Sequence, residues 1–107
     1  MKCNPQKIKT NCYKKIESTI EDTLYKNLKI STQADGVFLF RIKIIIENKQ
    51  IKSYFLRSNY DFYSVEIDLK TTLDKLLKKK INCDGEYIFK IIIDTVDFNI
   101  KVSPCLW

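Results

Sequence analysis

The first clear feature of the chain is a stretch in which apolar residues recur every three or four positions. The stretch runs from Asn11 to Ile30, and its apolar members are Tyr13, Ile16, Ile20, Leu24 and Leu28. This spacing places them on one side of an α-helix, whose other side is charged. We therefore expect an amphipathic helix that covers a sheet.

A strictly alternating pattern follows and predicts a β-hairpin. From Val37 to Ile46 every second residue belongs to one apolar face, formed by Phe38, Phe40, Ile42, Ile44 and Ile46. Alternation with a period of two is typical of a strand with one buried face. Turn-forming residues occupy positions 47–50, where Asn48 is best suited to a left-handed conformation. Ile51 to Leu56 then supplies the partner strand.

A second helical stripe lies in the second half of the chain. Its apolar members are Leu69, Leu73, Leu76, Leu77 and Ile81, and Asp68 is placed to cap it. A brief alternation at Tyr63, Val65 and Ile67 precedes the cap. The run Lys78, Lys79 and Lys80 falls in the expected last turn, where positive charge meets the negative end of the helix dipole.

Two further alternating runs, Tyr87 to Ile93 and Val96 to Val102, complete the pattern before Pro104. Asp94-Thr95 between them is either a tight turn or a bulge inside one long strand. The predicted order is α-β-β-α-β with one more strand. The fold class is therefore α+β: a single two-layer domain over residues 1–107, with a largely antiparallel sheet covered by two helices. Residues 1–10 are expected to be a flexible segment and residues 103–107 a C-terminal tail.

The chain is basic, because 19 Lys and Arg residues outnumber 13 Asp and Glu residues and give a net charge of +6. This excess fits an anionic partner such as a nucleic acid, an anionic membrane surface or an acidic protein. It also fits a solvated surface that keeps the domain soluble, and the dispersed lysines favour this interpretation. The apolar fraction of 45% excludes a disordered chain.

The sequence is compatible with more than one cellular compartment. No run of about 18 apolar residues predicts a transmembrane segment, and Met1 to Pro5 lead into no apolar signal core. We expect a cytoplasmic protein, or a periplasmic or secreted one whose signal has been removed. Two disulfides would fit export and free thiols would fit the cytoplasm. The four cysteines concerned are Cys3, Cys12, Cys83 and Cys105.

The sequence offers no recognisable catalytic set. It contains no histidine, which excludes Ser-His-Asp and Cys-His arrangements. Gly36 and Gly85 stand alone, so no glycine-rich phosphate loop can be drawn. The carboxylates of Asp94 and Asp97 are more simply solvent-facing charges than a catalytic pair. We expect no enzymatic activity, no cofactor and, without a CxxC pair, no metal site.

Basic and aromatic residues are interleaved in the hairpin. On a sheet with one open face, Arg41, Lys43, Lys52 and Tyr54 could present a charged and stacking surface to single-stranded nucleic acid. The lysine run at 78–80 could add to this surface. Strand alternation favours the simpler interpretation that the aromatics enter the core and the charges face solvent. A small basic nucleic-acid-binding protein is therefore the second function hypothesis.

The segment 36–58, GVFLFRIKIIIENKQIKSYFLRS, resembles the first hairpin of the TonB C-terminal domain family, and the order of the flanking elements agrees. The chain departs from that family at Asn48-Lys49, where a glycine is usual. The resemblance implies a periplasmic module that adds a short peptide as a strand to a sheet edge. The edge that it implies is the last strand, with Val96, Phe98 and Ile100 as partner-binding residues.

The leading hypothesis is accordingly a non-enzymatic protein- or peptide-binding module, either TonB-like or a small adaptor or immunity-type inhibitor. A protein or peptide is the expected partner and a nucleic acid the alternative. The sequence sets no oligomeric state.

Overall fold

A computed structural model describes residues 11–28, 36–58 and 69–105. Its elements are the helix α1 (Asn11–Asn27), the strands β1 (Val37–Glu47) and β2 (Gln50–Ser58), a second helix, and the strands β3 (Gly85–Asp94) and β4 (Asn99–Pro104). The second helix is α-helical over residues 69–73 and continues as the 3-10 turn η2 (Asp74–Leu76). The predicted α+β class and element order are confirmed. None of the described helices has the length and apolar character needed to cross a membrane.

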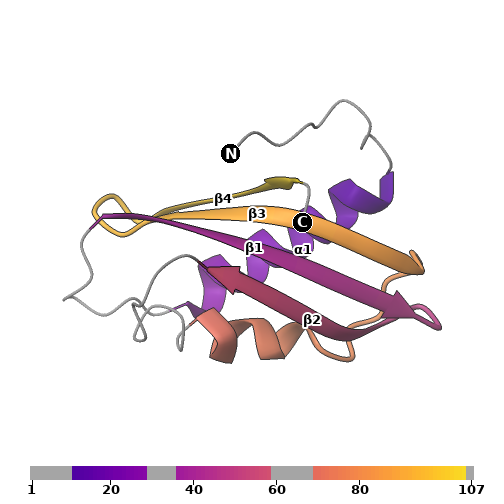
Figure 1. The fold of residues 1–107 in the computed structure, drawn as a ribbon. Coiled ribbons are helices and arrows are strands. Elements are labelled where there is room, and N and C mark those ends of the chain that lie inside the picture. Colours follow the sequence, from indigo (N-terminus) through magenta and orange to yellow (C-terminus); the bar gives the residue numbers. More distant parts are fainter. Residues whose placement is uncertain (1–10, 29–35, 59–68, 106–107) are drawn as a thin grey trace.

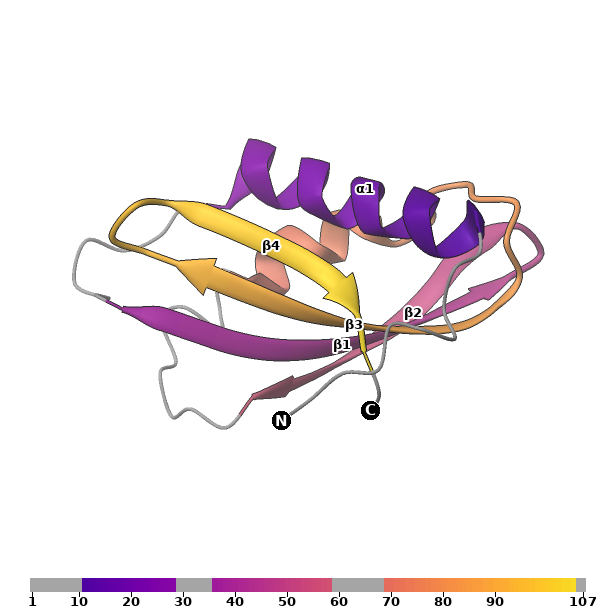
Figure 2. The ribbon, with the colours of Figure 1, turned by 90° about the horizontal axis from the view of Figure 1, so that it is seen from above.

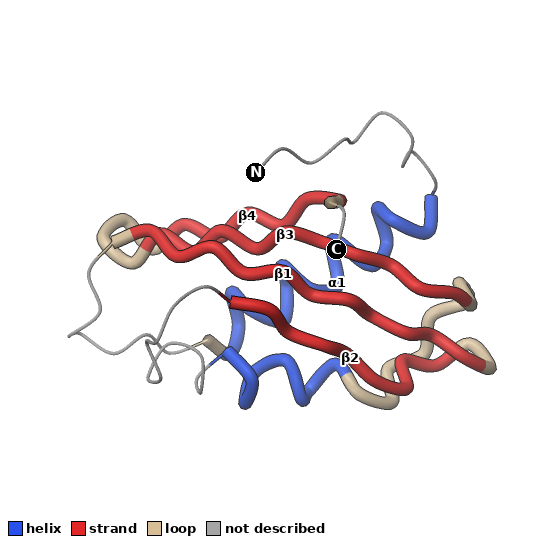
Figure 3. Tube along the Cα trace, in the orientation of Figure 1, coloured by secondary structure: helices blue, strands red, loops and turns tan. Residues whose placement is uncertain are grey.

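The four strands form one antiparallel sheet in the order β2-β1-β3-β4, so β2 and β4 are its edges (Figure 1). Figure 2 shows both helices on the same side of the sheet. We call the helix-covered side the inner face and the opposite side the outer face. In Figure 3 the second helix runs along β2, whereas α1 crosses behind β3 and β1. The helix α1 also packs against β4.

The core lies between the inner face and the helices. All five alternating residues predicted to share one face of β1 are buried, as are Ile16, Ile20 and Leu24 of α1 and Leu69, Leu73 and Leu76 of the second helix. Burying a large aliphatic side chain contributes about 1.5–3 kcal/mol. This inner layer is therefore the main source of stability.

A two-residue turn joins β1 to β2. Asn48 has a φ of 55° and Lys49 a φ of 61°, which is the left-handed pair of a type I′ hairpin turn. The prediction for Asn48 is confirmed, and Lys49 shares the conformation. The Asp84 carboxylate accepts hydrogen bonds from the Asn48 N–H (3.1 Å) and the Lys49 N–H (2.7 Å), which ties the turn to the start of β3.

The second helix is shorter than predicted. It ends at Leu76, and Lys78 has a φ of 72°, outside any helix. Residues 78–80 instead lie along β2: the Lys78 N–H donates to the Ile51 carbonyl (2.9 Å) and the Ile51 N–H donates to the Lys79 carbonyl (2.9 Å). Pairing with the exposed backbone of Ile51 thus replaces helical hydrogen bonds. The expected role of these lysines at a helix C-terminus is wrong.

The end of the sheet also differs from the prediction. Asp94-Thr95 leads into a turn over residues 95–98, so the two runs are separate strands. The Asp94 carboxylate accepts the N–H groups of Val96 (3.0 Å) and Asp97 (3.4 Å), which stabilises the turn. Val96 and Phe98 therefore lie in the turn rather than in a strand, and β4 continues to Pro104, inside the expected tail.

Two of the predicted cysteines are joined. Cys12 at the start of α1 forms a disulfide with Cys83, the residue two positions before β3, across a sequence separation of 71. Cys105 is also disulfide-bonded, and none of the cysteines that the structure describes is a free thiol. Cys3, residues 1–10, the cap Asp68 and the alternation at positions 63–67 lie outside the described residues.

Candidate functional site

The two edges of the sheet differ in how their backbone is occupied, and β4 is the more closed. The Ile100 N–H donates to the Tyr25 hydroxyl (2.8 Å), and that hydroxyl donates to the Ile100 carbonyl (3.0 Å) or the Asn99 side-chain oxygen (3.1 Å). The Tyr25 ring contacts Phe98 edge to face at 5.9 Å. A side chain of α1 thus takes the place of a neighbouring strand.

The rest of the β4 backbone has few outward N–H groups that a partner strand could pair with. The Cys105 N–H donates to the Ile88 carbonyl of β3 (3.0 Å). Because backbone direction alternates along a strand, Ile100, Val102 and Pro104 then face away from β3. Proline has no N–H to donate. Among the described residues of β4, only Val102 still offers an outward N–H, so the edge that the sequence predicted as the binding site is largely closed.

The first part of β2 is closed as well, by residues 78–80. Both backbone groups of Ile51 are paired with that segment, and Gln50 forms a bridge with Lys80. A register shift opposite Ile45 and Ile46 then inserts one extra residue into β2. This β-bulge puts Ile51 and Tyr54 on the same face of the sheet, although they are three residues apart.

The second part of β2 is open. The two-residue hairpin makes Glu47 and Gln50 a hydrogen-bonded pair, and counting through the bulge leaves Tyr54 and Leu56 with their N–H and C=O groups directed away from β1. No hydrogen bond from the described part of the chain reaches these groups. We call residues 53–57 the open edge. It presents two donors and two acceptors at the spacing of a β-ladder.

The second helix supports the open edge from the inner side. The Tyr54 hydroxyl lies 2.6 Å from the Asp74 carboxylate and 3.2 Å from the Lys70 carbonyl oxygen. Burial and the hydrogen bond to Asp74 raise the pKa of Tyr54 well above its ordinary value. The neutral hydroxyl therefore ties the edge strand to the helix that runs beside it in Figure 3.

Cationic side chains gather on the outer face next to the open edge. Arg57 of β2 pairs with Arg41 of β1, which pairs with Lys90 of β3, so three cations form one row across three strands. We call this the cationic row. Like charges directly opposite each other destabilise a sheet unless other groups compensate them, and Arg41 and Arg57 both take part in further interactions. Arg41 at its centre is only 9% exposed.

An aromatic side chain projects beside the row. Phe55 is 53% exposed although it is large and apolar, and it pairs with Lys43 on the same outer face. Tyr54, which the sequence grouped with the basic residues, points to the inner face because of the bulge. Lys52 is exposed within the bulge, and its ammonium lies 3.4 Å from the Gln50 side-chain oxygen.

The structure therefore divides the predicted basic surface. It places Arg41 and Lys43 together on the outer face, and it puts residues 78–80 at the β2 border near α1. Sequence reasoning missed Arg57, Lys90 and Phe55 as members of the outer face. Their alternation was visible, but the register that aligns them across strands was not.

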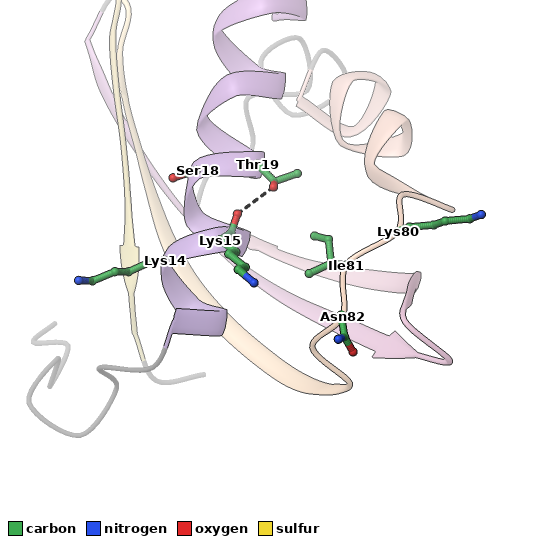
Figure 4. Close-up of a pocket in the computed structure, with 7 residues that line it drawn as sticks. All are labelled: Lys14, Lys15, Ser18, Thr19, Lys80, Ile81 and Asn82. Carbon is green, nitrogen blue, oxygen red and sulfur yellow. Dashed lines mark hydrogen bonds between the residues drawn. The ribbon is translucent and has the colours of Figure 1, made fainter.

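A hollow beside α1 is the other place where lysines gather. It has a volume of about 560 Å³ and is lined by Lys14, Lys15, Ser18, Thr19, Lys80, Ile81 and Asn82. In Figure 4 the ammonium groups of Lys14 and Lys80 point away from each other and out of the hollow. The Thr19 hydroxyl donates a hydrogen bond to the Lys15 carbonyl oxygen (2.8 Å). These groups do not converge on a common point, so the hollow lacks the geometry of an anion site.

The described residues contain no cluster of three or more Cys, Asp or Glu side chains that could hold a metal ion. Comparison with known proteins gives no family model that matches the chain, and neither a curated protein nor a solved structure matches it significantly.

Proposed function

We propose that this domain is a non-enzymatic protein-binding module that captures an extended segment of its partner as an additional strand beside β2. The observation that carries the proposal is the open edge, where the outward backbone groups of Tyr54 and Leu56 are unpaired within the described chain. An exposed strand edge is a template for pairing with another chain, and β-augmentation uses it for recognition.

The contrast between the two edges supports this choice of site. Tyr25 and Pro104 close β4, and residues 78–80 close the first part of β2, as proteins commonly do to prevent unwanted pairing. The open edge at residues 53–57 is therefore the part of the two edges that stays accessible to a partner strand. The resemblance to the TonB C-terminal domain family implies the same mode of binding, but at the last strand. In that strand, β4, fewer outward backbone groups are left unpaired within the described chain than at the open edge.

Amide hydrogen exchange along β2 tests the proposal. In the free protein the amides of Tyr54 and Leu56 should exchange faster than those of Phe55 and Arg57, which face β1. Titration with an array of seven-residue peptides that alternate Thr and Val should slow exchange at Tyr54 and Leu56. The Val102 amide on the opposite edge is the internal control. Protection at Val102 alone, or no peptide binding at all, would contradict the proposal.

A nucleic-acid-binding function is the second candidate, and the cationic row favours it. A single-stranded nucleic acid on the outer face would contact Arg57, Arg41 and Lys90 through phosphates and stack a base on Phe55. Binding of oligothymidylate that falls steeply between 50 and 200 mM salt is the expected sign of this function. The outer face offers just one exposed aromatic on its described strands, so we rank this function below peptide capture.

A further inference from the structure

The open edge is complementary to an identical copy of itself. Tyr54 and Leu56 direct their N–H and C=O groups away from β1, and Phe55 between them directs its own groups toward β1. If two copies meet antiparallel about a two-fold axis at Phe55, Tyr54 of each copy lies opposite Leu56 of the other. Each of these two pairs exchanges two N–H···O=C bonds, so four hydrogen bonds satisfy all the outward groups of Tyr54 and Leu56.

The neighbouring registers satisfy fewer of these groups. Moving the axis to Tyr54 places Leu56 opposite Lys52, where the β-bulge interrupts the ladder. Moving the axis to Leu56 places Tyr54 opposite Ser58, the last residue of the strand, beyond the open edge. The register centred on Phe55 is therefore the one that fits the length of the open edge.

The outward side chains of the two copies also match in this register. Phe55 lies directly opposite Phe55 of the second copy, at a non-hydrogen-bonded position where the two Cα atoms are about 4.5 Å apart. Phe55 is 53% exposed in the single chain, so pairing removes apolar surface of both rings from water, and aromatic pairs across strands add stability. Ser53 falls opposite Arg57, so within the open edge no two cations lie directly opposite each other.

The inner side of the seam would be apolar as well. Tyr54 and Leu56 both pack against the hydrophobic core, and the second helix runs along β2 on that side of the sheet (Figure 3). In the two-fold arrangement Tyr54 of one copy would contact Leu56 of the other. The apolar layer between sheet and helices would thus continue from one copy into the next.

The opposite edge of the sheet makes such an assembly finite. A chain with two open edges would pair at both of them and grow into a filament. Tyr25 and Pro104 leave β4 largely closed, so each copy has one open edge, and a two-fold contact at β2 uses both. The result would be a closed dimer with one continuous sheet, in the order β4-β3-β1-β2-β2-β1-β3-β4.

We propose that the partner captured by the open edge is a second copy of this chain, joined by an antiparallel pair of β2 strands centred on Phe55. This inference rests on the proposed function, because it names the partner at the same edge. A seam this short belongs to the class of weak, reversible interfaces.

The unmodified chain provides the first test. Sedimentation velocity at loadings from about 10 μM to about 1 mM brackets a weak association and should show a shift from monomer to dimer. At the lowest loading the amides of Tyr54 and Leu56 should exchange at the rates of the free protein, and at the highest they should be protected, whereas the Val102 amide should not change. The Thr/Val peptides should compete with the second copy and shift the sample toward monomer.

A pair of charge variants tests the register. Phe55→Glu and Phe55→Lys each place like charges directly opposite each other across the seam, and each should raise the dissociation constant of the dimer about tenfold. An equimolar mixture of the two variants places opposite charges there and should recover most of the lost affinity. Val37→Lys is the matched control. Val37 is 60% exposed on the outer face of β1 but lies beyond the end of β2, so the dimer should be unchanged.

Three results would overturn the inference. A chain that stays monomeric at the highest loading, while the peptides protect Leu56, would leave strand capture standing with a different partner. A dimer that forms without protecting Tyr54 and Leu56, or whose Phe55 variants do not recover on mixing, would use another surface or register. A monomer that also binds none of the peptides would remove the proposed function as well. The exchange measurement needs no variant, so it holds even if a Phe55 variant fails to fold.

Discussion

The hydroxyl of Tyr25 in α1 accepts the N–H of Ile100 at 2.8 Å and lies 3.0 Å from the carbonyl oxygen of the same residue in β4. One side chain therefore lies within hydrogen-bond distance of both outward backbone groups of an edge-strand residue that is 75 positions away in the sequence. This contact joins α1 to the sheet and decides which of the two sheet edges remains accessible.

Tyr25→Phe should open the β4 edge. The variant keeps the ring contact with Phe98 but leaves the N–H and C=O of Ile100 without their partner, so the free energy of unfolding should fall by about 1 kcal/mol. Urea denaturation measures the loss, and exchange of the Ile100 amide should accelerate. Tyr87→Phe is the matched control, since the Tyr87 hydroxyl makes one long hydrogen bond of 3.3 Å to the Asp84 carbonyl. Equal effects of both variants would show that Tyr25 does not protect the edge.

The Cys12–Cys83 disulfide should account for a large part of the stability. It closes a loop of 71 residues, and the chain-entropy relation gives about 4 kcal/mol for a loop of this length. The double variant Cys12→Ser with Cys83→Ser isolates this bond, whereas a reductant would also open the disulfide of Cys105. Thermal denaturation should show a clearly lower midpoint. An unchanged midpoint would mean that packing alone holds the start of α1.

The regular part of the fold could be predicted because it depends on local periodicity. The stripe of α1 and the alternation of β1 both place their buried residues correctly, since each pattern is repeated many times within one element. The turn at Asn48 could also be predicted from local sequence, because a two-residue hairpin turn favours residues that tolerate positive φ.

The open edge could not be predicted, because it depends on contacts between distant segments. The stripe from Leu69 to Ile81 continues the helical period past Leu76, yet residues 78–80 leave the helix to pair with Ile51. The bulge in β2 moves Tyr54 to the inner face, against unbroken alternation. Nothing near Val96 in the sequence indicates that Tyr25 closes the adjoining strand.

Lys49→Gly should stabilise the hairpin. Lys49 adopts a φ of 61°, a conformation that glycine takes without steric cost, and Asn-Gly is the favoured pair for a type I′ turn. The free energy of unfolding should rise by about 0.5–1 kcal/mol. Lys52→Gly places the same substitution within the strand and should lower stability. If Lys49→Gly were also destabilising, contacts of the lysine side chain would outweigh the backbone strain.

Alkaline pH should weaken the contact between Tyr54 of the open edge and Asp74 of the second helix, and so lower the free energy of unfolding. Its pKa is raised in the folded state above the ordinary value of 10.0, first by burial and then by the hydrogen bond and negative charge of Asp74. A group with a raised folded pKa contributes stability that is complete below its unfolded pKa and is lost as the pH rises above it. The contribution of Tyr54 should therefore be present up to about pH 10 and fall at higher pH.

Urea denaturation at pH 8 and at pH 11 measures this loss against two variants. Tyr54→Phe should be less stable than the unmodified chain at pH 8, because it lacks the 2.6 Å hydrogen bond to Asp74, and it should lose less stability between the two pH values. Asp74→Asn should also reduce the pH dependence, but only in part, because burial is the larger cause of the shift. Ionisation of the lysines affects all three proteins alike. If Tyr54→Phe lost as much stability as the unmodified chain between pH 8 and pH 11, the Tyr54–Asp74 contact would not be the alkaline-sensitive support of β2.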